Sequence, residues 1–165
     1  MIKKVILWTA VVLLSLRIFG FSSDTGTESD QVSKSITHVV VNVVMKSVPT
    51  VTQREWDAQK LFEICHKVVR KTAHFSIYAL LAMLTLLLAH SYDLKVRISA
   101  IISASYCLLF AISDEIHQLF VNGRSGQISD VCIDFCGALT GIAVLLLIQW
   151  MWKKIKKKKA RASAE

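Results

Sequence analysis

Long apolar runs, rather than the strict alternation of half-buried strands, dominate this sequence and predict helices. Four runs are long enough to cross a bilayer, at roughly 1.5 Å of rise per residue against a hydrocarbon core of about 30 Å. They are expected at residues 5–21, 72–90, 98–119 and 130–152. The predicted fold is all-α: a multi-pass membrane domain over residues 1–152, with four transmembrane helices in a bundle.

Composition changes between the first and second apolar runs. Within residues 22–70, apolar positions recur at helical spacing over 32–44 and again over 56–69, with Pro49 between the two stretches. Neither stretch is apolar enough to cross a membrane. We therefore expect two amphipathic helices here, lying along the interface or covering the bundle on the extracytoplasmic side.

The basic start of the chain fits either a signal peptide or a retained helix. Lys3 and Lys4 precede the first run, but no small-x-small cleavage site follows it, which favours a retained transmembrane helix. Arg17 interrupts this run near its outer end. It would need an acidic partner or would have to extend toward the interface.

The distribution of basic residues predicts orientation. Lys3, Lys4, Lys95, Arg97 and the basic tail at 153–165 fall on one side of the membrane if the chain crosses four times. The positive-inside rule makes that side, and both termini, cytoplasmic. The net charge of +8 does not indicate nucleic-acid binding, because the densest basic run directly follows an apolar span instead of forming a patch with aromatics.

The four cysteines, at 65, 107, 132 and 136, lack the paired spacing of a zinc site. Cys132 and Cys136 lie one helical turn apart in an apolar run, so we expect them to be buried thiols that behave as small hydrophobes. No metal and no other cofactor is expected.

Polar residues gather where apolar runs begin and end. The region 112–141 joins the third and fourth runs, and a second polar group opens the second run. The candidate site residues are Arg70, Lys71, His74, Tyr78, Asp114, Glu115, His117, Gln118, Arg124, Asp130 and Asp134. A bilayer core tolerates such groups only where they pair, line a cavity or act on a ligand.

The spacing of these residues places them on helix faces. The shared faces are Lys71, His74 and Tyr78; Asp114, His117 and Gln118; and Asp130, Asp134, Gly137 and Gly141. The simplest packing turns all three faces inward at the same depth. Gly137 and Gly141 would let another backbone approach closely beneath the acids.

A purely structural interpretation remains open. The four bases Arg17, Arg70, Lys71 and Arg124 nearly balance the four acids Asp114, Glu115, Asp130 and Asp134, so paired charges could simply fix the order of the helices. A metal site is disfavoured, because the Asp-Glu-x-His group has no established ligand spacing such as H-E-x-x-H.

Functional interpretations remain open beside it. His74 or His117 could act as a general base with Asp114 or Glu115 as its partner. Ser113 or Ser125 could be a nucleophile, although neither has the G-x-S-x-G context. The bases at positions 70, 71 and 124 could instead hold a phosphate or carboxylate.

Arg124 is expected to fold back over the site. It lies in a short loop between Gly123 and Gly126. A guanidinium can form two parallel bonds to one carboxylate. We expect a contact with Asp130, Asp134 or Asp114.

These motifs resemble those of the VanZ-like membrane proteins. Residues 70–75 with Tyr78 resemble a basic-His-Tyr signature, residues 113–120 a second motif, and Arg124 with Asp130, Asp134 and Gly137 a third. The serines at 22, 23, 29 and 33 resemble the Ser-rich entry of the family. The likeness covers nearly the whole chain. Asp134 departs from it, because Asn is more common there, and adds a negative charge.

The resemblance implies a bacterial plasma-membrane protein with a role in the cell envelope, and the namesake is associated with low-level teicoplanin resistance. It implies no agreed reaction or cofactor. We expect an outward-facing polar pocket that binds a lipid-linked or cell-wall ligand, with membrane lipids as partners. The alternatives are a membrane-embedded enzyme acting on such a ligand and a small-solute transporter. The inner halves of the spans, such as residues 80–88, are almost free of polar residues, which disfavours transport.

Overall fold

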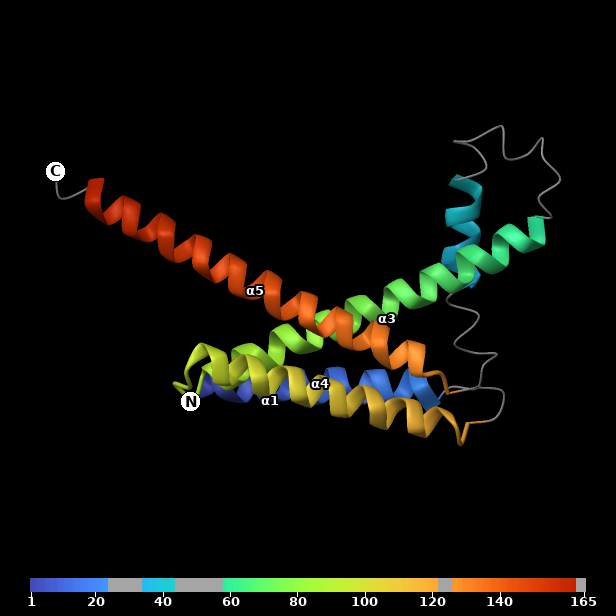
Figure 1. The fold of residues 1–165 in the computed structure, drawn as a ribbon, viewed down its shortest axis with the longest axis horizontal. Helices are drawn as coiled ribbons and strands as arrows, with labels where there is room; N and C mark the ends of the chain where they lie inside the picture. The colour runs from blue at the N-terminus through green and yellow to red at the C-terminus, as the bar shows by residue number, and fades with distance from the viewer. Residues whose placement is uncertain (24–33, 44–57, 122–125, 163–165) are drawn as a thin grey trace.

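Helices are the only regular structure in the computed structural model, which describes residues 1–23, 34–43, 58–121 and 126–162 (Figure 1). The four long helices are α1 (Ile2–Ser23), α3 (Ala58–His90), α4 (Val96–Gln118) and α5 (Ile128–Ala162). A short helix over residues 34–43 lies between α1 and α3 along the chain. No described residue is in a strand, so the all-α prediction is confirmed.

All four long helices are long and apolar enough to cross a membrane, judged by length and composition. They contain the four predicted runs, but α3 has 33 residues and α5 has 35. Helices of this size extend roughly 50 Å, whereas a hydrocarbon core is about 30 Å thick. The first half of α3 and the second half of α5 extend past the other helices in opposite directions (Figure 1).

The prediction of a separate second amphipathic helix is wrong. Residues 58–69 form the first turns of α3, which continues unbroken to His90. No proline or glycine interrupts this stretch, so nothing in the sequence ends the helix before the apolar run begins. The first predicted amphipathic stretch contains the helix over 34–43, and Pro49 lies outside the described residues.

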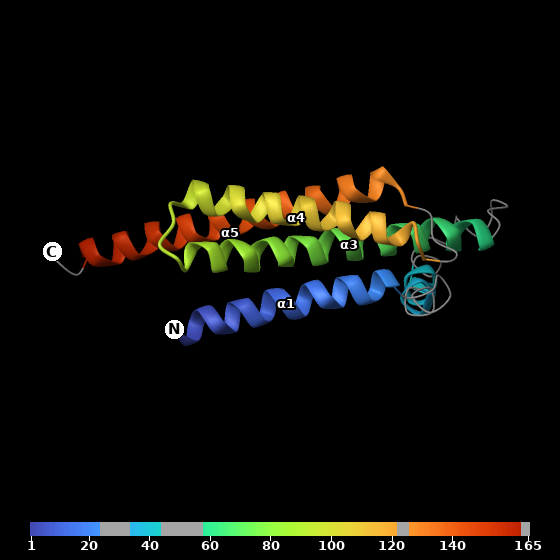
Figure 2. The same cartoon turned by 90° about the horizontal axis from the view of Figure 1, so that it is seen from below.

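α3 is the central helix, because it packs against each of the other three long helices. α4 and α5 also pack together, and α1 lies along α3 and α4 (Figure 2). The two ends of the chain lie at the same end of the molecule (Figure 2). The buried apolar core includes Val11, Leu81, Leu86, Cys107 and Ala138.

Two glycines allow α3 and α5 to approach each other closely. A Cβ added at Gly137 would collide with the carbonyl oxygen of Phe75, and one added at Gly141 would collide with that of Ala79. The sequence prediction of a close backbone approach at these positions is confirmed. This contact starts one turn beyond Asp134, so it also sets the separation of the two helices at the site.

Polar contacts along one face of α1 attach it to the rest of the molecule. The Trp8 indole N–H donates to the Tyr92 hydroxyl at 2.9 Å, and the Ser15 and Tyr106 hydroxyls lie 2.9 Å apart. Both tyrosines belong to α4 or to the turn before it. Trp8, Ser15 and Ser22 are spaced by seven residues, close to two helical turns, which keeps them on one face.

Candidate functional site

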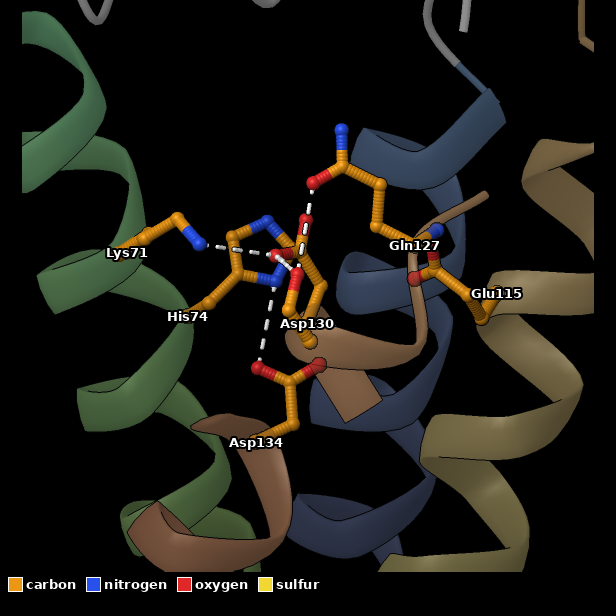
Figure 3. Close-up of polar contacts among 7 residues, drawn as sticks. Lys71, His74, Glu115, Gln127, Asp130 and Asp134 are labelled. Carbon is orange, nitrogen blue, oxygen red and sulfur yellow. Dashed lines mark hydrogen bonds and ion pairs between the residues drawn. The ribbon is translucent and has the colours of Figure 1, made fainter. Parts of the chain in front are cut away.

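Three helices bring polar side chains together where α4 ends and α5 begins, away from the α3–α4 turn (Figure 3). α3 contributes residues 71–78, α4 its last two turns and α5 its first two. α3 and α5 both run away from this end, whereas α4 runs toward it. Lys71 and Asp130 are therefore nearest the end, and Tyr78 and Asp114 lie deepest.

The outer pair consists of Lys71 and Asp130. The Lys71 ammonium lies 3.3 Å from Asp130 Oδ1, and the two side chains are 45% and 23% exposed. Both side chains are partly exposed, so solvent screens this pair and its contribution to stability is small. The Ser129 hydroxyl also donates to Asp130, at 3.3 Å.

The middle pair consists of His74 and Asp134, one turn deeper. His74 Nδ1 lies 3.5 Å from Asp134 Oδ1. The Asp134 side chain is only 2% exposed, whereas that of His74 is 28% exposed. The imidazole thus faces a buried carboxyl with one ring nitrogen while the residue remains reachable from outside. Asp134 is the acid at which the sequence departs from the motif that it resembles, and His74 is its partner among the described residues.

The inner group consists of Tyr78 and Asp114, both almost completely buried. Gln118 Nε2 donates to Asp114 Oδ2 at 3.2 Å. Asp114 Oδ1 and the Tyr78 hydroxyl have no hydrogen-bond partner among the described residues. Buried polar groups are paired in the large majority of cases, so this inner group is an exception that needs an explanation.

Glu115 accepts a hydrogen bond from the backbone N–H of Gln127, the residue just before α5 (Figure 3). This bond joins the end of α4 to the start of α5, where helical N–H groups lack partners within the helix. Gln127 was not among the predicted site residues, and only its place just before a predicted helix could have pointed to it. Glu115 was itself a candidate, and the structure buries it beside Asp114.

α1 closes one side of the site, a role that the face pattern did not predict. Ser22 is buried beside the site, and its hydroxyl, like Asp114 Oδ1, has no hydrogen-bond partner among the described residues. Phe19 stacks on His117, with ring centroids 4.2 Å apart. His117, predicted to share a face with Asp114, is half-buried against α1, whereas Asp114, Glu115 and Gln118 are buried.

Other candidates lie apart or outside the described residues. Arg124 and Ser125 lie outside them, so the predicted inward fold of Arg124 stays a prediction. Arg70 is half-buried on α3, and neither it nor the exposed Arg17 forms an ion pair with a described residue. Ser113 is exposed on α4.

The predicted burial of two thiols is wrong. Cys132 and Cys136 are exposed on α5, Cys65 is half-buried and Cys107 is buried. The apolar surroundings of Cys132 and Cys136 in the sequence are the outward face of α5, because Asp134 between them faces α3. Among the described residues, no three His, Cys, Asp or Glu side chains are arranged to hold a metal ion.

The geometry bears on both the structural and the functional interpretation of these residues. Among the described residues, one ion pair of the proposed structural network is present, Lys71–Asp130. The partner of Asp134 is His74, which was not part of that network. These contacts do not involve Asp114 Oδ1 or the Tyr78 hydroxyl, which have no hydrogen-bond partner among the described residues. Nearer the outside, the site offers a partly exposed imidazole and an ammonium.

Comparisons with known proteins agree with the motifs. No curated protein and no solved structure gave a match. The sequence does match the VanZ/LLP1 family over residues 6–149, a range that includes nearly all of α1, the whole of α3 and α4, and α5 as far as Gln149. Every site residue described above falls within it. The chain belongs to the VanZ/LLP1 family.

Proposed function

We propose that this protein spans the bacterial plasma membrane four times with both termini in the cytoplasm. Large apolar side chains are exposed along all four long helices, which suits contact with lipid. The chain termini and the α3–α4 turn lie at one end (Figure 2). That end carries Lys3, Lys4, Lys95, Arg97 and the basic C-terminal turns of α5, as expected of the cytoplasmic side.

In this orientation the polar site opens on the extracytoplasmic side and binds a lipid-linked or cell-wall ligand. The observation that carries this proposal is the unmatched inner group, Asp114 Oδ1 and the Tyr78 hydroxyl. An unmatched buried polar group costs about 1–3 kcal/mol, and apolar residues of similar shape would avoid that cost. A ligand that donates hydrogen bonds to these oxygens would remove that cost.

The biological role that we propose is in the cell envelope. Membership of the VanZ/LLP1 family supports an effect on susceptibility to glycopeptides such as teicoplanin or to other envelope-active antibiotics. Binding of an envelope precursor or lipid at the outer surface would alter what such antibiotics can reach. Expression of the chain in a susceptible bacterium should raise the inhibitory concentration of teicoplanin, and the Asp114→Asn variant should raise it less.

The middle pair favours an enzyme as the second candidate. A histidine held by a buried carboxyl at one ring nitrogen can use the other as a general base, provided that a substrate proton comes within hydrogen-bond reach. His74 and Asp134 have this arrangement and lie between the outer pair and the inner group. An enzyme predicts that His74→Ala abolishes activity while the fold survives, whereas a binding protein predicts graded losses across the site.

Transport is the weakest candidate. Two buried hydroxyls nearer the other end of α3 and α4 are bonded within the helix pair: Ser103 donates to the Ala82 carbonyl at 2.8 Å, and Thr85 and Ser103 lie 2.7 Å apart. Thr85 is also within bonding distance of the Leu81 carbonyl, at 2.9 Å. These groups serve packing and offer a solute no continuous polar path.

Extraction of lipids from the purified protein, followed by mass spectrometry, tests the proposal. We expect the wild-type protein to retain an envelope lipid or precursor that the Asp114→Asn and Tyr78→Phe variants retain less. Asp93→Asn is the matched control, because Asp93 is exposed in the turn at the opposite end. Equal retention by all four proteins would contradict a ligand-binding role for the site.

A further inference from the structure

The charges of the site change sign with depth. The outermost basic groups are Lys71, 45% exposed, and the half-buried Arg70 beside it. Tyr78 lies seven residues further along the same helix, about 10 Å deeper at 1.5 Å per residue. The inner group around it contains no basic side chain among the described residues. The entrance is thus basic and the interior acidic.

Pairing within the site sharpens this difference. Asp130 is paired with Lys71, and Asp134 with His74. Asp114 accepts one hydrogen bond, at Oδ2, from the neutral Gln118 amide. Its Oδ1 has no hydrogen-bond partner among the described residues, and the same is true of the Tyr78 and Ser22 hydroxyls and of Asp134 Oδ1. The inner group therefore contains an unmatched carboxyl oxygen and no positive charge.

An ammonium group supplies what the interior lacks. A primary ammonium has three N–H donors and a positive charge. A phosphate or carboxylate would instead meet the negative charge of Asp114 in a low-dielectric setting, where like charges repel strongly. The same anion would be attracted at the entrance, where Lys71 and Arg70 can follow it on long, flexible side chains.

We propose that the site binds a zwitterionic headgroup in which a primary ammonium and a phosphate are separated by a short carbon chain, as in phosphatidylethanolamine. The ammonium enters first and donates to Asp114 and Tyr78, and the phosphate stays near Lys71 and Arg70. This inference rests on the proposed ligand-binding function and names the chemical class of the ligand. The headgroup could belong to a membrane lipid or to a soluble phosphoethanolamine compound.

Competition binding in dodecylmaltoside micelles tests the headgroup chemistry. The probe is tritiated dioleoyl phosphatidylethanolamine bound to the full-length protein, displaced by unlabelled lipids that share its acyl chains. Phosphatidylethanolamine should compete at least about tenfold better than phosphatidylcholine, which has no N–H donor, and phosphatidylglycerol, which has no ammonium. Glycerophosphoethanolamine distinguishes the sources: equal competition by this soluble compound indicates a headgroup recognised without its lipid tails.

Two variants test the two ends of the site. Asp114→Asn should weaken phosphatidylethanolamine binding about tenfold or more, and Lys71→Gln should weaken it less, because Lys71 is more exposed. Asp93→Asn and Lys95→Gln, at the opposite end, are the charge-matched controls and should bind like the wild type. Asn is tolerated at Asp93, which has a φ of 60°. Unchanged melting temperatures would show that the variants remain folded.

Equal competition by the three lipids would overturn the proposal and indicate nonspecific lipid binding only. Wild-type affinity in Asp114→Asn would overturn it as well. If mass spectrometry of the purified protein finds a retained ligand without an ammonium, the ligand class is wrong but the binding function stands. If no ligand is retained and no lipid competes, both fail.

Discussion

Replacement of Gly137 by alanine tests how closely α3 and α5 must approach. The new Cβ would collide with the Phe75 carbonyl oxygen and lie 2.9 Å from its carbon and 3.0 Å from the Phe75 Cα. These atoms belong to the backbone of a 33-residue helix and cannot rotate away as a side chain would. The two helices must therefore separate locally.

Gly20→Ala provides the matched control, because a Cβ at Gly20 would meet nothing within 4 Å. Both substitutions replace a helical glycine by alanine, so both gain the intrinsic preference of alanine for helix, about 1 kcal/mol. The difference between the two variants then isolates the steric cost. Overpacking typically costs about 1–3 kcal/mol, and collision with backbone places Gly137→Ala at the upper end.

The measurement is the free energy of unfolding in mixed micelles of dodecylmaltoside and dodecyl sulfate, followed by circular dichroism. We expect Gly137→Ala to be less stable than Gly20→Ala by about 2–3 kcal/mol. The separation of the helices should also weaken the contact between His74 and Asp134, since Asp134 lies one turn from Gly137. Equal stability of the two variants would refute the close packing of α3 and α5.

Three further predictions concern other parts of the chain. Thr85→Val should destabilise the protein by about 1 kcal/mol in the same unfolding assay, because it removes the buried partner of Ser103. Thr140→Val is the control, since the exposed Thr140 hydroxyl bonds to the Cys136 carbonyl of its own helix. An equal effect of the two substitutions would contradict a role for the Thr85–Ser103 contact. In a cysteine-free background, a cysteine at position 127 should react with an impermeant maleimide added outside intact cells; labelling from the cytoplasm alone would reverse the proposed orientation. Arg124→Lys should reduce retention of the co-purified ligand almost as much as Arg124→Ala, because an ammonium cannot form two parallel bonds to a carboxylate; full retention by the alanine variant would remove Arg124 from the site.

The sequence by itself determined the helical class and the position of the site. Apolar runs of about 20 residues can satisfy their backbone groups in a lipid only as helices, so four long helices could be predicted from composition and length. The spacing of Lys71, His74 and Tyr78, and of Asp130 and Asp134, is a property of the helix alone, so their shared faces were predictable too.

Only the tertiary structure decided how the helices are rotated and which side chains meet. Whether Glu115 or His117 is the more buried residue depends on where α1 and α5 lie against α4. The sequence pattern of α4 alone does not determine this. The exposure of Cys132 and Cys136 follows from the face of α5 that Gly137 and Gly141 press against α3. The pairing of His74 with Asp134 is set in the same way, because side-chain contacts between helices separated by some 60 residues depend on packing, whereas periodicity acts only within one helix.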